Sequence, residues 1–261
     1  MKLLTWNVNS IRLRLDRLAD LCQREAPDVL CLQELKCTDA DFPSDAIAAL
    51  GYNTSFWGQK GYNGVAILAR APLALRDVRR NFAGSPVAEE ARSLWATVGD
   101  LRIASLYMVN GQSVGSDKYQ VKLDFFAALT AHLQREMIAH PELVIAGDFN
   151  VAPEDRDVYD PRLWKGRILC SDREREALQA LLGLGLVDLH RQVDQSAGVY
   201  SWWDYRFGQF SRDRGLRIDL LLGSAALAQR VSAATVDRRA RDPKSSSDKP
   251  SDHAPVIVTI T

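Results

Sequence analysis

The sequence predicts an α/β fold in which two mixed β-sheets pack against each other and helices cover their outer faces. Apolar runs rich in β-branched residues recur along the whole chain, and helical patterns lie between several of them. Some runs have very short links, such as Gly99-Asp100, which predicts a hairpin turn. Hairpins make neighbouring strands antiparallel and helical crossovers make them parallel, so both directions are expected.

Each element follows from its local pattern. Apolar, β-branched character predicts strands over 2–8, 28–33, 65–69, 94–98, 102–108, 143–147, 217–223 and 255–260. Helical spacing of apolar residues predicts helices over 11–25, 119–139 and 172–184, the first capped by Ser10 and the third by Ser171 or Asp172. No linker divides the chain, so residues 1–261 are expected to form a single domain, with a mobile polar loop over 239–252.

The composition narrows the class of protein. Hydrophobic residues make up 46% and charged residues 25%, and the net charge is zero. Zero net charge weighs against a strongly basic nucleic-acid-binding protein but allows a local positive face. The four cysteines have no CxxC spacing and the N-terminus has no signal-peptide pattern, so a cytoplasmic protein is expected. No apolar run approaches the ~20 residues that cross a bilayer, so no membrane partner is expected.

Polar side chains stand at the ends of several apolar runs, where a rigid sheet holds groups beside open loops. These residues are Asn7, Glu34, Asp148, Asn150, Asp252 and His253. Two carboxylates about 4 Å apart repel by roughly 4 kcal/mol, so converging acids either take up protons or are compensated by a cation. Oxygen ligands without a Cys or His cluster favour Mg²⁺, or Mn²⁺, over zinc. The pattern predicts a metal-assisted phosphoester hydrolase, although Glu34 taken alone also fits a simple strand-end residue.

Asp219 is a charge within the apolar run 216–222, where burial is costly unless the carboxylate has a partner. A structural ion pair with Arg217 is the alternative, and it is disfavoured on the alternation of side chains along a strand. His253 is the expected partner, held by Asp219 in the way that hydrolases orient an acid–base histidine. The role of His190 stays open.

Seven short strings in this order and spacing resemble the exonuclease III family of the endonuclease/exonuclease/phosphatase superfamily. The likeness runs from about residue 2 to residue 260 and implies a DNase I-like sandwich of four layers, two mixed sheets flanked by helices. The strings are Thr5–Arg12, Leu32–Lys36, Tyr62–Ala66, Gly147–Asn150, Trp202–Tyr205, Gly215–Asp219 and Ser251–Pro255.

The resemblance implies separate sets of residues for metal binding and for proton transfer. Glu34 would hold the divalent ion with help from Asn7, and Asp252 would assist the metal or the histidine. Asp148 would act as general base for water or as proton donor to the leaving oxygen. His253, oriented by Asp219, would contact the scissile phosphate or activate the water itself, so the identity of the base stays open.

The resemblance also implies phosphate contacts. Asn150 would position the phosphate or the nucleophile, and Tyr107 and Asn110 match the tyrosine and asparagine on the phosphate side. Two departures are visible, since Val109 stands where related enzymes often have proline and Asn9 where the eukaryotic relatives have aspartate. A second metal contact at position 9 is therefore not expected.

The expected partner is double-stranded DNA with abasic sites, nicks or 3′ ends, and no obligatory protein partner is implied. Arg212 and Arg214 are the expected phosphate contacts, with Arg206, Arg217, Lys118, Lys122, Lys165 and Arg167 as further candidates. Any of these cations also fits a solvated face. Trp202, Leu216 and Ile218 match the family's pocket for a flipped abasic sugar, but without the family they read as core.

Loop 161–171 matches the family least. Trp164 or Leu169 is expected either to wedge against the duplex or to fill the abasic pocket, in which case the enzyme trims 3′ ends and cuts internal abasic sites poorly. Two other functions remain as alternatives: a superfamily phosphatase for a small phosphorylated molecule, and a catalytically inactive nucleic-acid-binding regulator. The second alternative is disfavoured because Glu34, Asp148 and His253 are all present.

Overall fold

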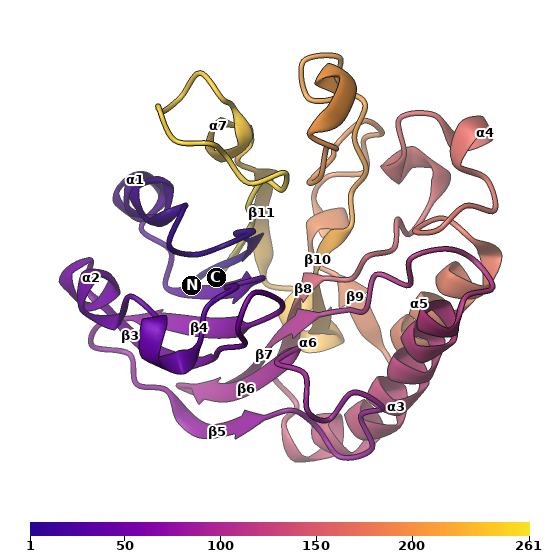
Figure 1. Ribbon diagram of the computed structural model, residues 1–261. Helices are drawn as coiled ribbons and strands as arrows, with labels where there is room; N and C mark the ends of the chain where they lie inside the picture. The colour runs from indigo at the N-terminus through magenta and orange to yellow at the C-terminus, as the bar shows by residue number, and fades with distance from the viewer.

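The computed structural model describes residues 1–261. It contains two six-stranded mixed sheets that lie face to face (Figure 1). The first sheet has the order β11 (Val231–Val236), β12 (Val256–Ile260), β1 (Lys2–Asn7), β2 (Val29–Gln33), β4 (Val65–Arg70) and β3 (Tyr52–Trp57). The second has the order β5 (Arg76–Arg80), β6 (Ser93–Val98), β7 (Leu101–Tyr107), β8 (Leu143–Asp148), β10 (Asp219–Ser224) and β9 (Leu186–Asp188).

Helices cover both outer faces and complete the four layers that the sequence predicted. Helices α1 (Leu15–Glu25) and α2 (Ser44–Ala49) flank the first sheet, and α3 (Asp117–Ala139) and α5 (Asp172–Leu182) flank the second (Figure 1). Three short helices lie in the connections: α4 (Pro161–Trp164), α6 (Ala225–Ala228) and α7 (Arg238–Arg241). No helix is both long and apolar enough to span a membrane.

The core follows the layers. Side chains from both sheets meet in a central cluster that includes Val29, Ile67, Val144 and Leu221. A second cluster joins the outer face of the second sheet to α3 and α5, and a third joins the first sheet to α1 and α2. Because the strands that lead to the functional edge, among them β1, β2, β8 and β10, are buried, their ends are held rigidly.

One edge of this scaffold collects the functional strand ends. Strand β1 runs parallel to β2, and β7 runs parallel to β8, so the carboxyl ends within each pair lie together. Strands β10 and β12 run antiparallel to β8 and β1, which brings their starting residues to the same edge. The close approach of β7 and β8 requires Gly147, because a Cβ there would lie 1.9 Å from the Leu106 carbonyl oxygen.

The predicted strands and the three helices are confirmed, with boundaries shifted by a few residues. The Gly99-Asp100 hairpin is confirmed by the antiparallel pairing of β6 with β7. Ser171 caps α5, accepting from the Glu174 N–H. The Ser10 cap was wrong, because α1 begins at Leu15 after Arg14 and Ser10 has a φ of 91°.

The polar loop expected over 239–252 overlaps the short helix α7 and is held by hydrogen bonds from two arginines. Arg17 donates hydrogen bonds to the carbonyl oxygens of Ala240, Asp242 and Ser246, and Arg14 donates to the Pro250 carbonyl. Two buried arginines near the start of α1 therefore hold this segment just before it enters the site at Asp252. The sequence reading missed β3, β5, β9, β11 and α2, which are short, exposed or only partly buried.

Candidate active site

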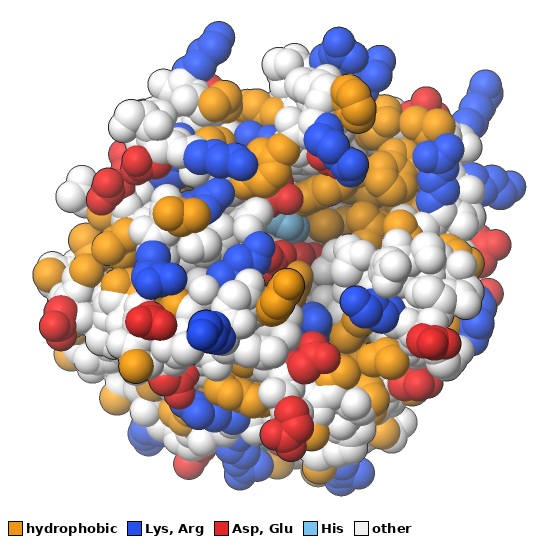
Figure 2. Space-filling view, in the orientation of Figure 1, with side chains coloured by type: hydrophobic (Ala, Val, Ile, Leu, Met, Phe, Trp, Pro, Cys, Tyr) orange, Lys and Arg blue, Asp and Glu red, His pale blue; other side chains and the backbone are white.

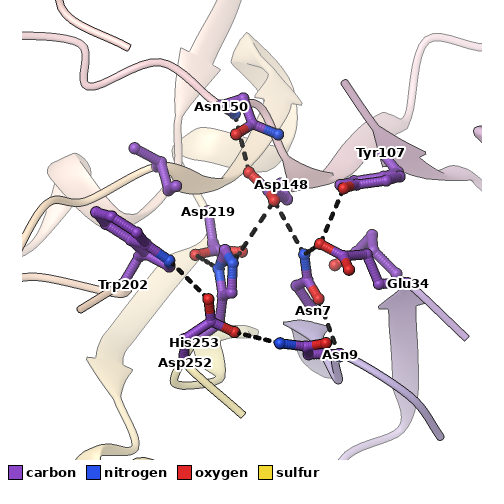
Figure 3. Close-up of polar contacts among 12 residues, drawn as sticks. Asn7, Asn9, Glu34, Tyr107, Asp148, Asn150, Trp202, Asp219, Asp252 and His253 are labelled. Atoms are coloured by element: carbon purple, nitrogen blue, oxygen red, sulfur yellow. Dashed lines mark hydrogen bonds and ion pairs between the residues drawn. The ribbon is translucent and has the colours of Figure 1, made fainter. Parts of the chain in front are cut away.

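Two carboxylates from the two sheets meet at the edge of the sandwich. Asn7, at the end of β1, donates its side-chain N–H to Glu34 Oε1 at 2.8 Å and to Asp148 Oδ2 at 3.0 Å (Figure 3). Tyr107, at the end of β7, donates its hydroxyl to the same Glu34 oxygen at 2.9 Å. Lys36 Nζ lies 2.7 Å from the other oxygen, Oε2. Both oxygens of Glu34 are thus held by hydrogen bonds or an ion pair. Glu34 follows β2 in the first sheet, whereas Tyr107 and Asp148 belong to the second sheet.

The backbone at three residues of the site has a positive φ, which residues other than glycine seldom adopt. Glu34 has a φ of 53°, Lys36 of 52° and Asn150 of 52°. Left-handed backbone at residues other than glycine costs about 1 kcal/mol or more and is concentrated at functional sites. Here it turns the chain sharply after β2 and β8, so that the polar side chains point back over the strand ends.

His253 is held by Asp219, as the sequence predicted. Its Nδ1 lies 2.9 Å and 3.1 Å from the two Asp219 oxygens, and its Nε2 lies 3.7 Å from Asp148 Oδ2. Ser201 donates its hydroxyl to Asp219 Oδ2 at 2.6 Å, which fixes the aspartate in turn. Since Nδ1 is committed to Asp219, the other ring nitrogen is the one that faces the site.

Burial and charge shift the acid–base properties of this group. Burial raises the pKa of the Asp148 carboxyl to about 7, in the direction also favoured by Asp219 and against the effect of His253. Burial alone would lower the pKa of His253, but the Asp219 and Asp148 carboxylates outweigh it and raise the pKa to about 10. Burial opposes ionisation of Glu34 too, yet Lys36 and Asn7 bring its pKa below the usual value.

The donor set fits a small divalent cation. Glu34, Asp148 and His253 each present a ligand atom, and these atoms lie within 4.8 Å of one another. The Lys36 ammonium shows that the Glu34 carboxylate is placed to bind a positive charge, because the two form an ion pair. Carboxylate oxygens predominate, as hard cations such as Mg²⁺ prefer. Glu34 is the most accessible of the three.

Two residues expected at the metal have other partners. The Asn7 oxygen accepts from the Asn9 N–H at 3.0 Å, and the amide nitrogen faces the Glu34 and Asp148 carboxylates. Asp252 accepts from Asn9 Nδ2 at 2.8 Å and from Trp202 Nε1 at 3.0 Å, outside the cluster of possible ligands (Figure 3). Adjacent residues in extended chain point to opposite sides, which separates Asp252 from His253.

Asn110 and Asn150, which are expected to contact phosphate, form a hydrogen-bonded pair. Asn110 donates its side-chain N–H to Asn150 Oδ1 at 2.9 Å, and Asn150 donates its own to the Met108 carbonyl at 3.0 Å. The Asn150 backbone N–H donates to Asp148 Oδ1 at 2.9 Å. The loops after β7 and β8 are therefore tied to each other and to the Asp148 carboxylate.

The residues expected to form the sugar pocket lie among buried apolar side chains. Leu216 and Ile218 belong to a buried cluster with Val158, Leu169 and Cys170, and Trp164, Ile168 and Trp202 pack against it. Leu169 is 5% exposed and has a φ of 72°. Leu169, and not only the three residues named from the family, thus contributes to this wall.

The arginines divide into two groups. Arg212 and Arg214 are exposed and form no ion pair, as phosphate contacts require, whereas Arg206 pairs with Asp204. The prediction of Arg217 as a phosphate contact was wrong, because this side chain is 1% exposed and is paired with Asp157 and Asp188. Lys122 was wrong for the same reason: it is fully buried beside Glu174.

The face that carries the site is hollowed. Figure 2 shows acidic side chains and a histidine at the floor of the hollow, an apolar wall on one side, and Lys and Arg side chains around the rim. A negative floor within a positive rim suits a phosphate backbone that approaches a metal.

His190 lies elsewhere: it is buried, its ring nitrogens have no partner, and burial lowers its pKa to about 4, so it is neutral.

Sequence reasoning missed the roles of two residues, Lys36 and Ser201, and expected a different role for a third, Lys122. Lys36 and Ser201 fix Glu34 and Asp219, and Lys122 lies beneath the two asparagines. Lys36 stands two residues after Glu34 and Ser201 beside Trp202, but neither position has a distinctive pattern. Lys122 had a signal, since it falls three and four residues before Phe125 and Phe126, on the buried stripe of α3.

Comparisons with known proteins agree with this geometry. Residues 4–253 match the Endonuclease/Exonuclease/phosphatase family model. The chain is 34% identical over 270 residues to "Exodeoxyribonuclease III" of Haemophilus influenzae, covering 98% of both sequences. It superimposes on the Neisseria meningitidis 3′-5′ exonuclease NExo with a TM-score of 0.94 and 43% identity, covering 100% of this chain and 99% of that one.

A second structural relative is an AP endonuclease from Archaeoglobus fulgidus, with a TM-score of 0.92, 34% identity, and coverage of 100% of this chain and 99% of that one. The likeness extends over both sheets and includes the DNase I-like arrangement of four layers. The chain therefore belongs to the Endonuclease/Exonuclease/phosphatase family, within its exonuclease III branch.

Proposed function

We propose that the protein is a Mg²⁺-dependent phosphodiesterase of DNA repair that acts chiefly on blocked 3′ ends of duplex DNA. The single observation that carries the proposal is the meeting of Glu34, Asp148 and His253 at one strand edge, with Asp219 behind the histidine. A solved relative from Neisseria is described as a 3′ phosphatase bound to a product DNA hairpin, and it is 42% identical with a TM-score of 0.95. The complete set of chemical groups argues against an inactive binding protein.

The residues suggest how a phosphoester is held. Glu34 would hold the cation, and Asn7 and Tyr107 would keep its carboxylate in place. Bound Mg²⁺ would polarise the phosphoryl oxygen and offset charge on the leaving oxygen. Asn150 and Asn110 would orient the phosphate from the other side, and Asp252 would fix the wall at Trp202.

Proton transfer is assigned to the pair Asp148 and His253. Asp148 accepts hydrogen bonds from Asn7 and from the Asn150 N–H, which leave its carboxylate oriented to take a proton from an attacking water. His253, fixed on Nδ1 by Asp219, would donate Nε2–H to a phosphate oxygen and stabilise the charge that develops there. Arg212 and Arg214 would bind phosphates along the backbone of the duplex.

The preference for 3′ ends rests on the apolar wall. Leu169 packs with Leu216 and Ile218 where a flipped abasic sugar is expected. A buried side chain in that space raises the free-energy cost of admitting an internal abasic nucleotide, since Leu169 must first move. A terminal phosphate needs no such pocket, because only the phosphate has to reach the metal.

The test compares a duplex carrying a 3′-phosphate at a nick with a duplex carrying an internal abasic site, both with Mg²⁺. The 3′-phosphate should be removed at least about tenfold faster, a difference of about 1.4 kcal/mol in activation free energy. Leu169→Gly, which suits the positive φ and removes the side chain, should raise abasic incision and leave 3′-phosphate removal unchanged.

Leu163→Ala is the matched control, because Leu163 is exposed on the same loop and lies outside the cluster. It should change neither rate. Equal rates for the wild-type enzyme on the two duplexes would contradict the preference for 3′ ends, and absence of hydrolysis on both would contradict the proposed activity.

A further inference from the structure

Lys122 is a lysine in the interior of α3 with no exposed surface. Its ammonium group makes three contacts: the Asn150 carbonyl at 2.7 Å, the Asn110 carbonyl at 3.2 Å, and the Glu174 carboxylate. Both Lys122 and Glu174 have side chains that are 0% exposed. A buried ion pair contributes little stability over apolar residues of the same size, so its presence calls for another explanation.

The contacts of Lys122 fall on both loops of the phosphate side. Asn110 follows β7 and Asn150 follows β8, and their side chains are hydrogen-bonded to each other. Lys122 therefore joins through the main chain the same two residues that are joined through their side chains. Gly111, with a φ of 90°, packs on the lysine stem, since a Cβ there would lie 3.2 Å from Lys122 Cδ.

Glu174 extends these contacts to the apolar wall. Its Oε1 accepts from the Leu169 N–H at 3.1 Å, and its Oε2 accepts from the Ser171 N–H and hydroxyl at 3.1 Å and 2.6 Å. The same Gly111 Cβ would lie 3.0 Å from Ile168 Cδ1. One ion pair thus connects the loops of Asn110, Asn150 and Leu169, although α3 and α5 carry none of the reacting groups.

We infer that Lys122 and Glu174 form a positioning pair that fixes Asn110, Asn150 and the Leu169 wall as one unit for phosphate binding and substrate selection. The inference rests on the proposed function of these three residues. The pair acts from behind the site and touches no substrate. A shift of about 1 Å in positioned groups is enough to lower a rate by roughly 100-fold, which gives the pair a route to affect turnover.

The test must separate positioning from stability. Lys122→Met alone leaves a buried carboxylate unpaired and should lower the melting temperature. The double variant K122M/E174Q removes both charges, keeps an oxygen to accept from the Leu169 N–H, and should recover most of the lost melting temperature. It still lacks the donor for the Asn110 and Asn150 carbonyls, so its kcat should stay at least about tenfold below wild type with KM within about threefold.

R102M/E136Q is the matched control. Arg102 and Glu136 form another buried ion pair between α3 and the second sheet, at 2.7 Å and away from the asparagine loops. The melting temperature of this variant should fall by about as much as that of K122M/E174Q. Its kcat on the nicked 3′-phosphate duplex should equal that of the wild type. An equal fall of kcat in both double variants would overturn the inference, because the effect would then come from the stability of α3.

Epistasis and structure give two further readouts. In an Asn110→Ala background, K122M/E174Q should lower kcat by less than it does in wild type, because one of the positioned groups is already absent. A crystal structure of K122M/E174Q should show the Asn110–Asn150 hydrogen bond broken. If K122M/E174Q keeps the Asn110–Asn150 bond and a wild-type kcat, the inference is overturned, even when Asn150→Ala is impaired. If the wild-type enzyme is inactive but the bond is broken in K122M/E174Q, only the proposed function is overturned.

Discussion

Asp148→Asn is expected to lower kcat by about 10² to 10⁴-fold, the range attributed to a positioned acid–base group. Asparagine keeps the shape of the side chain and an oxygen that can accept from the Asn7 amide or the Asn150 N–H. It cannot take a proton from water. The fold should therefore survive while the chemistry is lost, as measured by single-turnover hydrolysis of the 3′-phosphate substrate with Mg²⁺.

Asp155→Asn is the control for this substitution. Asp155 lies seven residues further along, in an exposed ion pair with Arg175. It should retain wild-type turnover, and both variants should show wild-type circular dichroism and thermal unfolding. Near-normal turnover in Asp148→Asn would remove this carboxylate from proton transfer.

His253→Ala is expected to lower kcat by about 10² to 10³-fold, as does the loss of a donor that stabilises a developing oxyanion. This variant differs from the first in its effect on stability. It leaves Asp219 buried with Ser201 but without its imidazole partner, which should lower the free energy of unfolding by about 3 kcal/mol.

The two effects of His253→Ala can be separated. Adding Asp219→Ala to His253→Ala removes the unpaired carboxylate and should restore part of the stability in chemical denaturation, without restoring kcat. A double variant that regains both would mean that the histidine acts only on the fold. Full activity in His253→Ala at saturating substrate would exclude the histidine from the reaction.

The sequence was informative at Asp219, where a charged residue stands inside an apolar strand. Asp219 inside an apolar strand required a partner, and the partner is His253. Apolar runs located most strands and hence the edge where Asn7, Glu34 and Asp148 meet, because a strand buried on both faces has a continuous apolar pattern. The family resemblance then gave the fold of four layers, which the structural relatives bear out.

The same reasoning failed where a segment has no apolar pattern or where the partner is distant in sequence. Strand β5, Arg76–Arg80, is exposed throughout and therefore has no apolar alternation. Arg217 looked like a phosphate contact because its two aspartate partners, Asp157 and Asp188, lie far away along the chain.

The account depends most on one ion at the Glu34 carboxylate. Crystals of the wild-type protein soaked in Mn²⁺ should show an anomalous difference peak about 2 Å from a Glu34 oxygen, close to Asp148 and His253, as expected for carboxylate ligation. Crystals of Glu34→Gln treated in the same way should lose the peak. A wild-type peak beside Asp252 and Asn9, or none at the Glu34 cluster, would contradict the account.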